Sequence, residues 1–165
     1  MPDQKLDVNF FKPFIDGTRH TLKVQCDLDV VHDKPFIKGT RPQPEFQIAG
    51  IIGITSTAFT GTITICFPKA VYLKIIGTML GEVYTEITPD LQDGASELMN
   101  IIFGSAKVVL NQQGYAIEKA IPTVICGDNL VTAQIGRGTV MVLPFHTPTG
   151  EFHIEIVTEG LAMAG

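Results

Sequence analysis

The chain has 165 residues, of which 45% are hydrophobic and 18% are charged, and its formal net charge is −5. This length suits a single domain spanning residues 1–165, and the apolar fraction excludes a wholly disordered chain, because disorder requires low hydrophobicity with high charge. Asp and Glu (17) outnumber Lys and Arg (12), which argues against a nucleic-acid-binding protein, since phosphate contacts need a basic surface.

The three cysteines are widely spaced and form no CxxC pair: Cys26, Cys66 and Cys126. Such a set is typical of reduced thiols in a cytosolic protein. The N-terminal sequence MPDQKLDVNFF contains no apolar signal core, so we expect a cytoplasmic location.

The first half of the chain predicts a helix, a loop and two strands. The helix covers residues 8–24 and is disturbed by Pro13 and Gly17, and residues 32–45 have the Pro, Gly and Lys/Arg content of a surface loop. Residues 46–68 carry no charge and are long enough to cross a bilayer. Glycines and threonines interrupt this stretch, however, and the alternation over residues 62–67 is that of a half-buried strand. We therefore predict two strands joined by a turn at residues 56–61, and no membrane association.

The second half predicts two helices followed by strands. Pro68 begins a helix over residues 68–81. A longer helix begins at Thr88-Pro89-Asp90 and ends at Gly114, and its apolar stripe consists of Leu91, Ala95, Leu98, Ile102, Ala106 and Val109. Strands are predicted at 120–127, 139–145 and 151–159. The fold class is α+β, with a mostly antiparallel sheet packed by two long helices.

Polar residues occupy the opposite side of the long helix: Glu97, Asn100, Gly104, Lys107 and Asn111. Glu97 and Asn100 are three residues apart and therefore project side by side. Asn and Gly are poor helix formers, so their presence in a helix interior calls for a reason. One interpretation is an ordinary solvated face, and the other is a surface that a partner approaches closely.

The wider pattern resembles the CheX branch of the CheC/CheX/FliY family of phosphatases, which act on the chemotaxis response regulator CheY. The matching positions are Asp93, Glu97, Asn100, Gly104 and Lys107, followed by Pro122, Val124 and Gly127. The resemblance implies that Asn100 aligns a water for attack on a receiver's aspartyl phosphate, and that Glu97 pairs with the receiver's lysine. Gly104 and Lys107 would contact the same partner.

The resemblance also implies that the chain needs no cofactor of its own, because the receiver domain holds the Mg²⁺. It suggests a homodimer joined through sheet edges, which fits the uncharged strands at 46–68, since bare apolar edges aggregate. A weak internal repeat relates Asp16-Gly17 to Asp93-Gly94, which gives the fold a pseudo-twofold character and aligns His20 and Lys23 with Glu97 and Asn100. A lysine cannot take the role of Asn100, so we expect one active site.

Two other functions stay open: a non-catalytic module that binds receivers or flagellar-switch components, and a small-ligand sensor that uses the strand pair as a pocket wall.

Several weaker site candidates have simpler explanations. His153 and Glu155, with His146 and Glu151 nearby, suggest a metal site, but solvation of an edge strand is the favoured interpretation, so we predict no metal ligands. Gly136-Arg137-Gly138 fits a turn between strands. Ser96 and Ser105 have no histidine partner by sequence, and the basic loop 34–41 is expected to be solvated.

Overall fold

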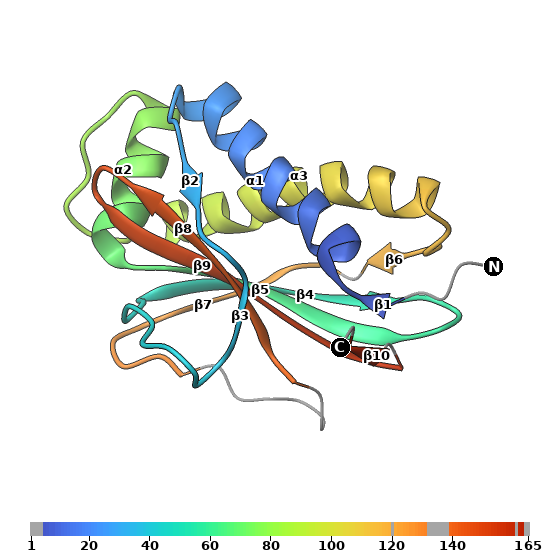
Figure 1. Ribbon diagram of the computed structural model, residues 1–165. Coiled ribbons are helices and arrows are strands. Elements are labelled where there is room, and N and C mark those ends of the chain that lie inside the picture. The colour runs from blue at the N-terminus through green and yellow to red at the C-terminus, as the bar shows by residue number, and fades with distance from the viewer. Residues whose placement is uncertain (1–4, 120, 132–138, 161, 164–165) are drawn as a thin grey trace.

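A computed structural model describes residues 5–119, 121–131, 139–160 and 162–163. These residues form three helices, α1 (Val8–Cys26), α2 (Lys69–Leu80) and α3 (Pro89–Gln112). The strands are β1 (Lys5–Leu6), β2 (Val31–His32), β3 (Phe36–Ile37), β4 (Ile48–Thr55), β5 (Thr60–Phe67), β6 (Glu118–Lys119), β7 (Thr123–Cys126), β8 (Met141–Thr147), β9 (Gly150–Glu159) and β10 (Ala162–Met163). All three helices lie on one side of the main sheet (Figure 1).

The main sheet has eight strands, and every pairing in it is antiparallel. Its order is β2-β8-β9-β5-β4-β6, with β3 also paired to β8 and β7 also paired to β4. The short strands β1 and β10 form a separate parallel pair. The predicted α+β class with a mostly antiparallel sheet is confirmed.

Helix α1 is longer and more regular than its sequence suggests. It runs without a break from Val8 to Cys26, although Pro13 and Gly17 were expected to disturb it. The Asp7 carboxylate caps the first turn by accepting hydrogen bonds from the backbone N–H groups of Asn9 and Phe10. Gly17 lies against α3, where a Cβ would stand 3.3 Å from the Ile102 carbonyl oxygen. The glycine therefore serves the helix crossing, and packing outweighs its poor helix propensity.

The uncharged stretch forms the predicted strand pair. Strands β4 and β5 pair along their whole lengths, and the Ser56 hydroxyl accepts hydrogen bonds from the N–H groups of Ala58 and Phe59 in the turn between them. None of the helices in the described ranges is long and apolar enough to cross a membrane.

The core lies between the helices and the sheet. Phe10 and Phe14 of α1 and Phe103 of α3 are fully buried there, and rings of α1 and α3 meet at Phe14 and Phe103. Helix α3 approaches the sheet closely at Gly50 of β4, where a Cβ would stand 3.1 Å from the Met99 sulfur. This contact fixes which side of α3 faces inward.

Two expectations about strand position are wrong. Strands β4 and β5 lie inside the sheet, not at its edges, so their uncharged surfaces give no support to an edge-to-edge homodimer. Strand β9 lies between β8 and β5, so His153 and Glu155 are not solvated edge residues. The outer positions of the main sheet are taken instead by the short strands β2, β3, β6 and β7.

We predict that Gly77→Ala destabilises the protein, although alanine favours helices. A Cβ at residue 77 in α2 would stand 2.6 Å from the carbonyl oxygen of Glu82, a backbone atom that cannot rotate away. Relieving such overpacking costs about 1–3 kcal/mol. Urea unfolding of the parent and the variant measures the difference, and an equal or higher free energy of unfolding in the variant would contradict the prediction.

Candidate functional site

The predicted polar stripe lies on the outer side of α3. Glu97 is exposed, Asn100 and Lys107 are half-buried, and the apolar residues that hold the helix against the core lie on its other side. Glu97 and Asn100 are separated by about 4.5 Å along the helix axis. Glu97 forms no ion pair with any described residue. A carboxylate and a carboxamide therefore stand side by side on a helix that the core prevents from turning.

Gly104 is the one glycine inside a helix that has open space at its Cβ position, among the described residues. No heavy atom lies within 4 Å of the position its Cβ would take, whereas Gly17, Gly77 and Gly94 all face close neighbours there. An interior glycine costs about 0.5–1 kcal/mol relative to alanine. No packing contact in the described chain therefore explains a glycine at residue 104.

Two further residues of the stripe have different roles. Lys107 lies about 15 Å along the helix from Glu97, so it can contact only a partner that covers much of the helix. The Asn111 side chain accepts a hydrogen bond from the Ile117 N–H (2.7 Å) and donates one to the Ile117 carbonyl oxygen (3.3 Å). Asn111 therefore orders the chain after α3 and belongs to the scaffold. Val109, predicted as part of the buried stripe, is exposed.

The aligned positions on α1 form no comparable pair. Lys23 is bound to Asp27 (2.9 Å) and Asp29 (3.3 Å), and these carboxylates raise the pKa of Lys23. His20 is exposed, and Asp16 forms an ion pair with Lys12. That the protein has a single site stays a prediction.

A groove of about 410 Å³ runs between α1 and α3. It is lined by residues that include Lys12, Asp16, His20, Ser105 and Val109. Ser105 and His20 thus share one groove, which the sequence did not indicate, but no hydrogen bond joins them in the described part of the chain. Among the described residues, the groove therefore shows no hydrogen-bonded serine–histidine pair of the kind that activates a serine nucleophile.

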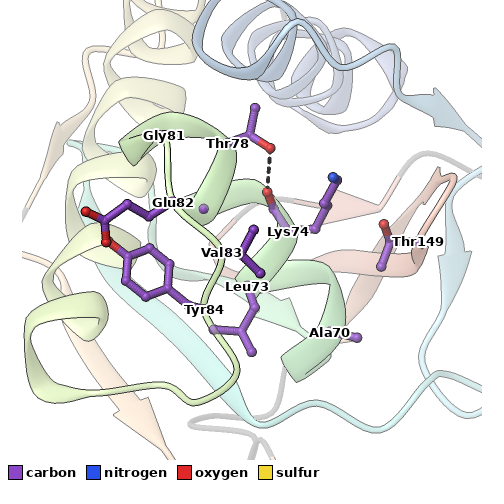
Figure 2. Close-up of a pocket in the computed structure, with 10 residues that line it drawn as sticks. Ala70, Leu73, Lys74, Thr78, Gly81, Glu82, Val83, Tyr84 and Thr149 are labelled. Carbon is purple, nitrogen blue, oxygen red and sulfur yellow. Dashed lines mark hydrogen bonds between the residues drawn. The ribbon is translucent and has the colours of Figure 1, made fainter.

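A second groove, of about 640 Å³, lies along α2 (Figure 2). Its walls come from Ala70, Leu73, Lys74 and Thr78 of α2, from residues 81–84 and from Thr149. The Thr78 hydroxyl donates to the Lys74 carbonyl oxygen of its own helix, and the Glu82 and Tyr84 side chains lie together at the other side. These polar groups do not converge on one point, so the groove shows no catalytic arrangement.

The two histidines near the C-terminal hairpin lie in different environments. On β8, His146 binds Asp33 through Nε2 (2.6 Å) and Glu151 through Nδ1 (3.1 Å) at the surface. His153 and Glu155 are buried on the sheet face away from the helices, beside Cys66 of β5. Burial lowers the pKa of His153 and raises that of the Cys66 thiol. The sequence singled out His153 and Glu155 but missed Cys66, because only the strand register places Cys66 opposite His153.

The basic loop makes specific side-chain contacts. Lys38 forms an ion pair with Glu155 (2.8 Å), and the Arg41 guanidinium lies 4.3 Å from the centre of the Phe36 ring. Lys38 therefore reaches the far face of the sheet. The expectation of a solvated loop fails at Lys38 but holds for most of the loop, because Lys34, Ile37, Gly39, Thr40 and Arg41 are exposed. Gly136-Arg137-Gly138 lies outside the described residues.

Comparison with known proteins identifies relatives of this architecture. Residues 48–146 match the family model described as chemotaxis phosphatase CheX. A CheC-like superfamily protein from Shewanella sp. PV-4 is 31% identical, with a TM-score of 0.87 over 94% of this chain and 100% of that one. CheX from Vibrio vulnificus is 28% identical, with a TM-score of 0.85 over 91% and 99%. The fold also matches a CheX–CheY–BeF₃–Mg²⁺ complex from Borrelia burgdorferi, with 19% identity and a TM-score of 0.77 over 93% and 99%. Among proteins of curated function, none matches the sequence.

We predict that Gly104→Ala stabilises the isolated protein by about 0.5–1 kcal/mol, because alanine is the better helix former and the new methyl group meets open space. Gly77→Ala is the matched control, since the same substitution in α2 creates a clash. Urea unfolding of the two variants is expected to give shifts of opposite sign. A destabilised Gly104→Ala would show that the glycine serves the fold.

Proposed function

Because this chain belongs to the CheX family of chemotaxis phosphatases, we propose that it hydrolyses the aspartyl phosphate of a CheY-like receiver domain through Glu97 and Asn100. The observation that carries the proposal is the outer stripe of α3, where Glu97, Asn100 and Gly104 face outward from a helix locked in the core. The Borrelia burgdorferi relative forms a complex with CheY, and we propose the same class of partner here.

Asn100 is the group that positions the attacking water. Its carboxamide offers one hydrogen-bond acceptor and two donors but no base for proton transfer at neutral pH. In phosphoryl transfer the enzyme contributes chiefly positioning and electrostatic stabilisation, so an oriented water in line with the bond to the leaving carboxylate lowers the barrier. Water attacks phosphorus, the phosphorus–oxygen bond to the aspartate breaks, and the products are a free carboxylate and inorganic phosphate.

Glu97 docks the helix on the receiver. It is exposed and has no ion-pair partner among the described residues, so its carboxylate is available to the lysine of a receiver's phosphate site. A charge-assisted hydrogen bond of this kind sets register more than it adds affinity. Asn100 lies three residues after Glu97, almost one helical turn, so docking of Glu97 brings the Asn100 carboxamide to the phosphoryl group.

Gly104 and Lys107 extend the contact along α3. The missing side chain at residue 104 lets the partner's surface reach the helix backbone, and Lys107 offers a positive charge farther along. The Mg²⁺ that phosphoryl transfer requires belongs to the receiver in this proposal, and the reaction takes place in the cytoplasm. Homodimer formation stays a proposal that light scattering of the purified protein can test.

We predict that Asn100→Ala abolishes the accelerated loss of phosphate from a cognate receiver while binding changes little, because the substitution removes the water-positioning group and leaves the docking residue. Glu97→Ala is expected to weaken binding and activity together. The measurements are the release of phosphate from a phosphorylated receiver with time, and the affinity for a receiver carrying beryllofluoride.

Gln112→Ala is the matched control, because Gln112 is an exposed amide on the same helix away from the stripe. Its phosphatase rate should equal that of the parent. A parent protein that binds the receiver without accelerating phosphate loss would favour the non-catalytic binding module. An Asn100→Ala variant as fast as the parent would contradict the mechanism.

We predict that Gly104→Ala lowers affinity for the receiver even though it stabilises the free protein, because the methyl group occupies space that the partner needs. Binding and unfolding are measured on the same preparation. Ser105→Ala, one residue away and off the stripe, should leave affinity unchanged. Full affinity in Gly104→Ala would show that no partner approaches the helix backbone there.

A further inference from the structure

A cluster of potential metal ligands lies on the sheet face away from the helices. Cys66 stands opposite His153 in the β5–β9 pairing, and Glu155 follows two residues later on the same face of β9. One ligand atom from each of the three side chains lies within 4.8 Å of the others, and no other group of this kind occurs in the described residues. The three residues come from two central strands, which hold them in place without any loop.

His153 supplies a second and independent observation. The residue is 2% exposed, yet neither of its ring nitrogens has a hydrogen-bond partner in the described part of the chain. Leaving a buried polar group unsatisfied costs about 1–3 kcal/mol, so native structures give such groups partners. The Phe46 and His153 rings pack in a T-shaped arrangement, with a centroid distance of 5.8 Å and an interplanar angle of 83°. His153 Nε2 lies 3.8 Å from Oε1 of Glu155, which is too long for a hydrogen bond but places this nitrogen beside the other members of the cluster.

We propose that Cys66, His153 and Glu155 bind a Zn²⁺-class transition metal ion. Thiolate, imidazole and carboxylate are the ligands that Zn²⁺ takes in proteins, at about 2.0–2.3 Å. Tetrahedral geometry with those bond lengths needs ligand atoms roughly 3.3–3.8 Å apart, which small side-chain rotations can reach from the present separation. Three protein ligands leave a fourth position for water or another small ligand.

The ligand set selects against hard cations. Mg²⁺ and Ca²⁺ prefer oxygen ligands, and this cluster offers only one oxygen-bearing side chain among its three members. The inference departs from the expectation of a chain without metal ligands. That expectation assumed an edge strand, whereas Cys66 is 0%, His153 2% and Glu155 5% exposed.

When no metal ion is bound, the Lys38 ammonium group neutralises the Glu155 carboxylate. Its ammonium group lies 2.8 Å from Oε1 of Glu155 and compensates the buried carboxylate, and Gln43 Nε2 lies 3.5 Å from the same oxygen. The Lys38 side chain is 25% exposed, and it follows the short strand β3. It can therefore turn into solvent when a metal ion takes over its charge, so the two cations compete for Glu155.

The test is titration of chelator-treated protein with Zn²⁺ in competition with a chromophoric chelator, and with Co²⁺ followed by absorption. We expect one equivalent of Zn²⁺, a near-ultraviolet thiolate-to-cobalt band, and no displacement by excess Mg²⁺. Loss of one supporting group around a metal costs about 10–100-fold in affinity, so loss of a ligand in Cys66→Ser, His153→Gln or Glu155→Gln should cost at least that much. Lys38→Met should tighten binding.

Matched controls separate this site from adventitious binding. Cys26→Ser removes another buried thiol, Cys126→Ser removes the exposed one, and His146→Gln removes the surface histidine bound to two carboxylates. All three should bind Zn²⁺ as the parent does. Circular dichroism identifies any ligand variant that fails to fold. If Cys66→Ser or His153→Gln fails to fold, the Zn²⁺ affinity of the nearly isosteric Glu155→Gln decides whether the cluster binds the metal ion.

Absence of Zn²⁺ binding, or binding that survives Cys66→Ser and Glu155→Gln, overturns the proposal, and unchanged affinity in Lys38→Met overturns the competition. No receiver enters these measurements, so their outcome is independent of the phosphatase proposal.

Discussion

The seating of α3 on the sheet is the constraint on which the rest of the molecule depends. Gly50 of β4 has no side chain, and Met99 and the backbone at Ala95 come down onto it. A larger residue at position 50 would lift the helix or turn it about its axis. Successive residues of an α-helix are about 100° apart around its axis. A rotation of α3 about its axis would therefore turn Glu97 and Asn100 away from the outward direction. The direction of the polar stripe is therefore set by contacts on the opposite side of the helix.

Helix α1 packs against a second side of α3. Gly17 lets the two helices approach closely beside Ile102, and the Phe14 and Phe103 rings meet at a centroid distance of 6.2 Å. On the other flank, Gly94 lies under Ile76 and Tyr72 of α2, and the Tyr72 hydroxyl donates to the Leu91 carbonyl oxygen. Three glycines thus accept neighbours, and Gly104 accepts none. Among the glycines inside the described helices, Gly17, Gly77 and Gly94 therefore serve packing, whereas Gly104 has open space at its Cβ position.

Local patterns predicted the parts of this structure that local physics controls. The period of α3, its proline and acidic first turn, and the alternation in β5 each act over a few residues, and both elements formed where they were expected. Strand β5 is not half-buried as its alternation predicted, however, because Thr64 and Cys66 are buried on the far face as well. Strand order is different, because it depends on which distant segments pair. His153 and Glu155 would show the same alternation on an edge strand or a central one, so the sequence could not distinguish a solvated pair from a buried one. Cys66 lies 87 residues from His153 along the chain, and Lys38 lies 117 residues from Glu155.

The two faces of the sheet are coupled through alternation in the same strands. On β5, Ile65 points into the core beneath α3 while Cys66 points to the far face, and on β9 the neighbours Ile154 and His153 divide in the same way. Ile65 and Ile154 lie near Met99, Ile102 and Phe103 on the core side of α3, which rests on Gly50 of β4. Protein interiors are close-packed, so these side chains and the sheet beneath them fit one another tightly. Strands β5 and β9 therefore contribute residues both to the core under α3 and to the polar cluster on the far face.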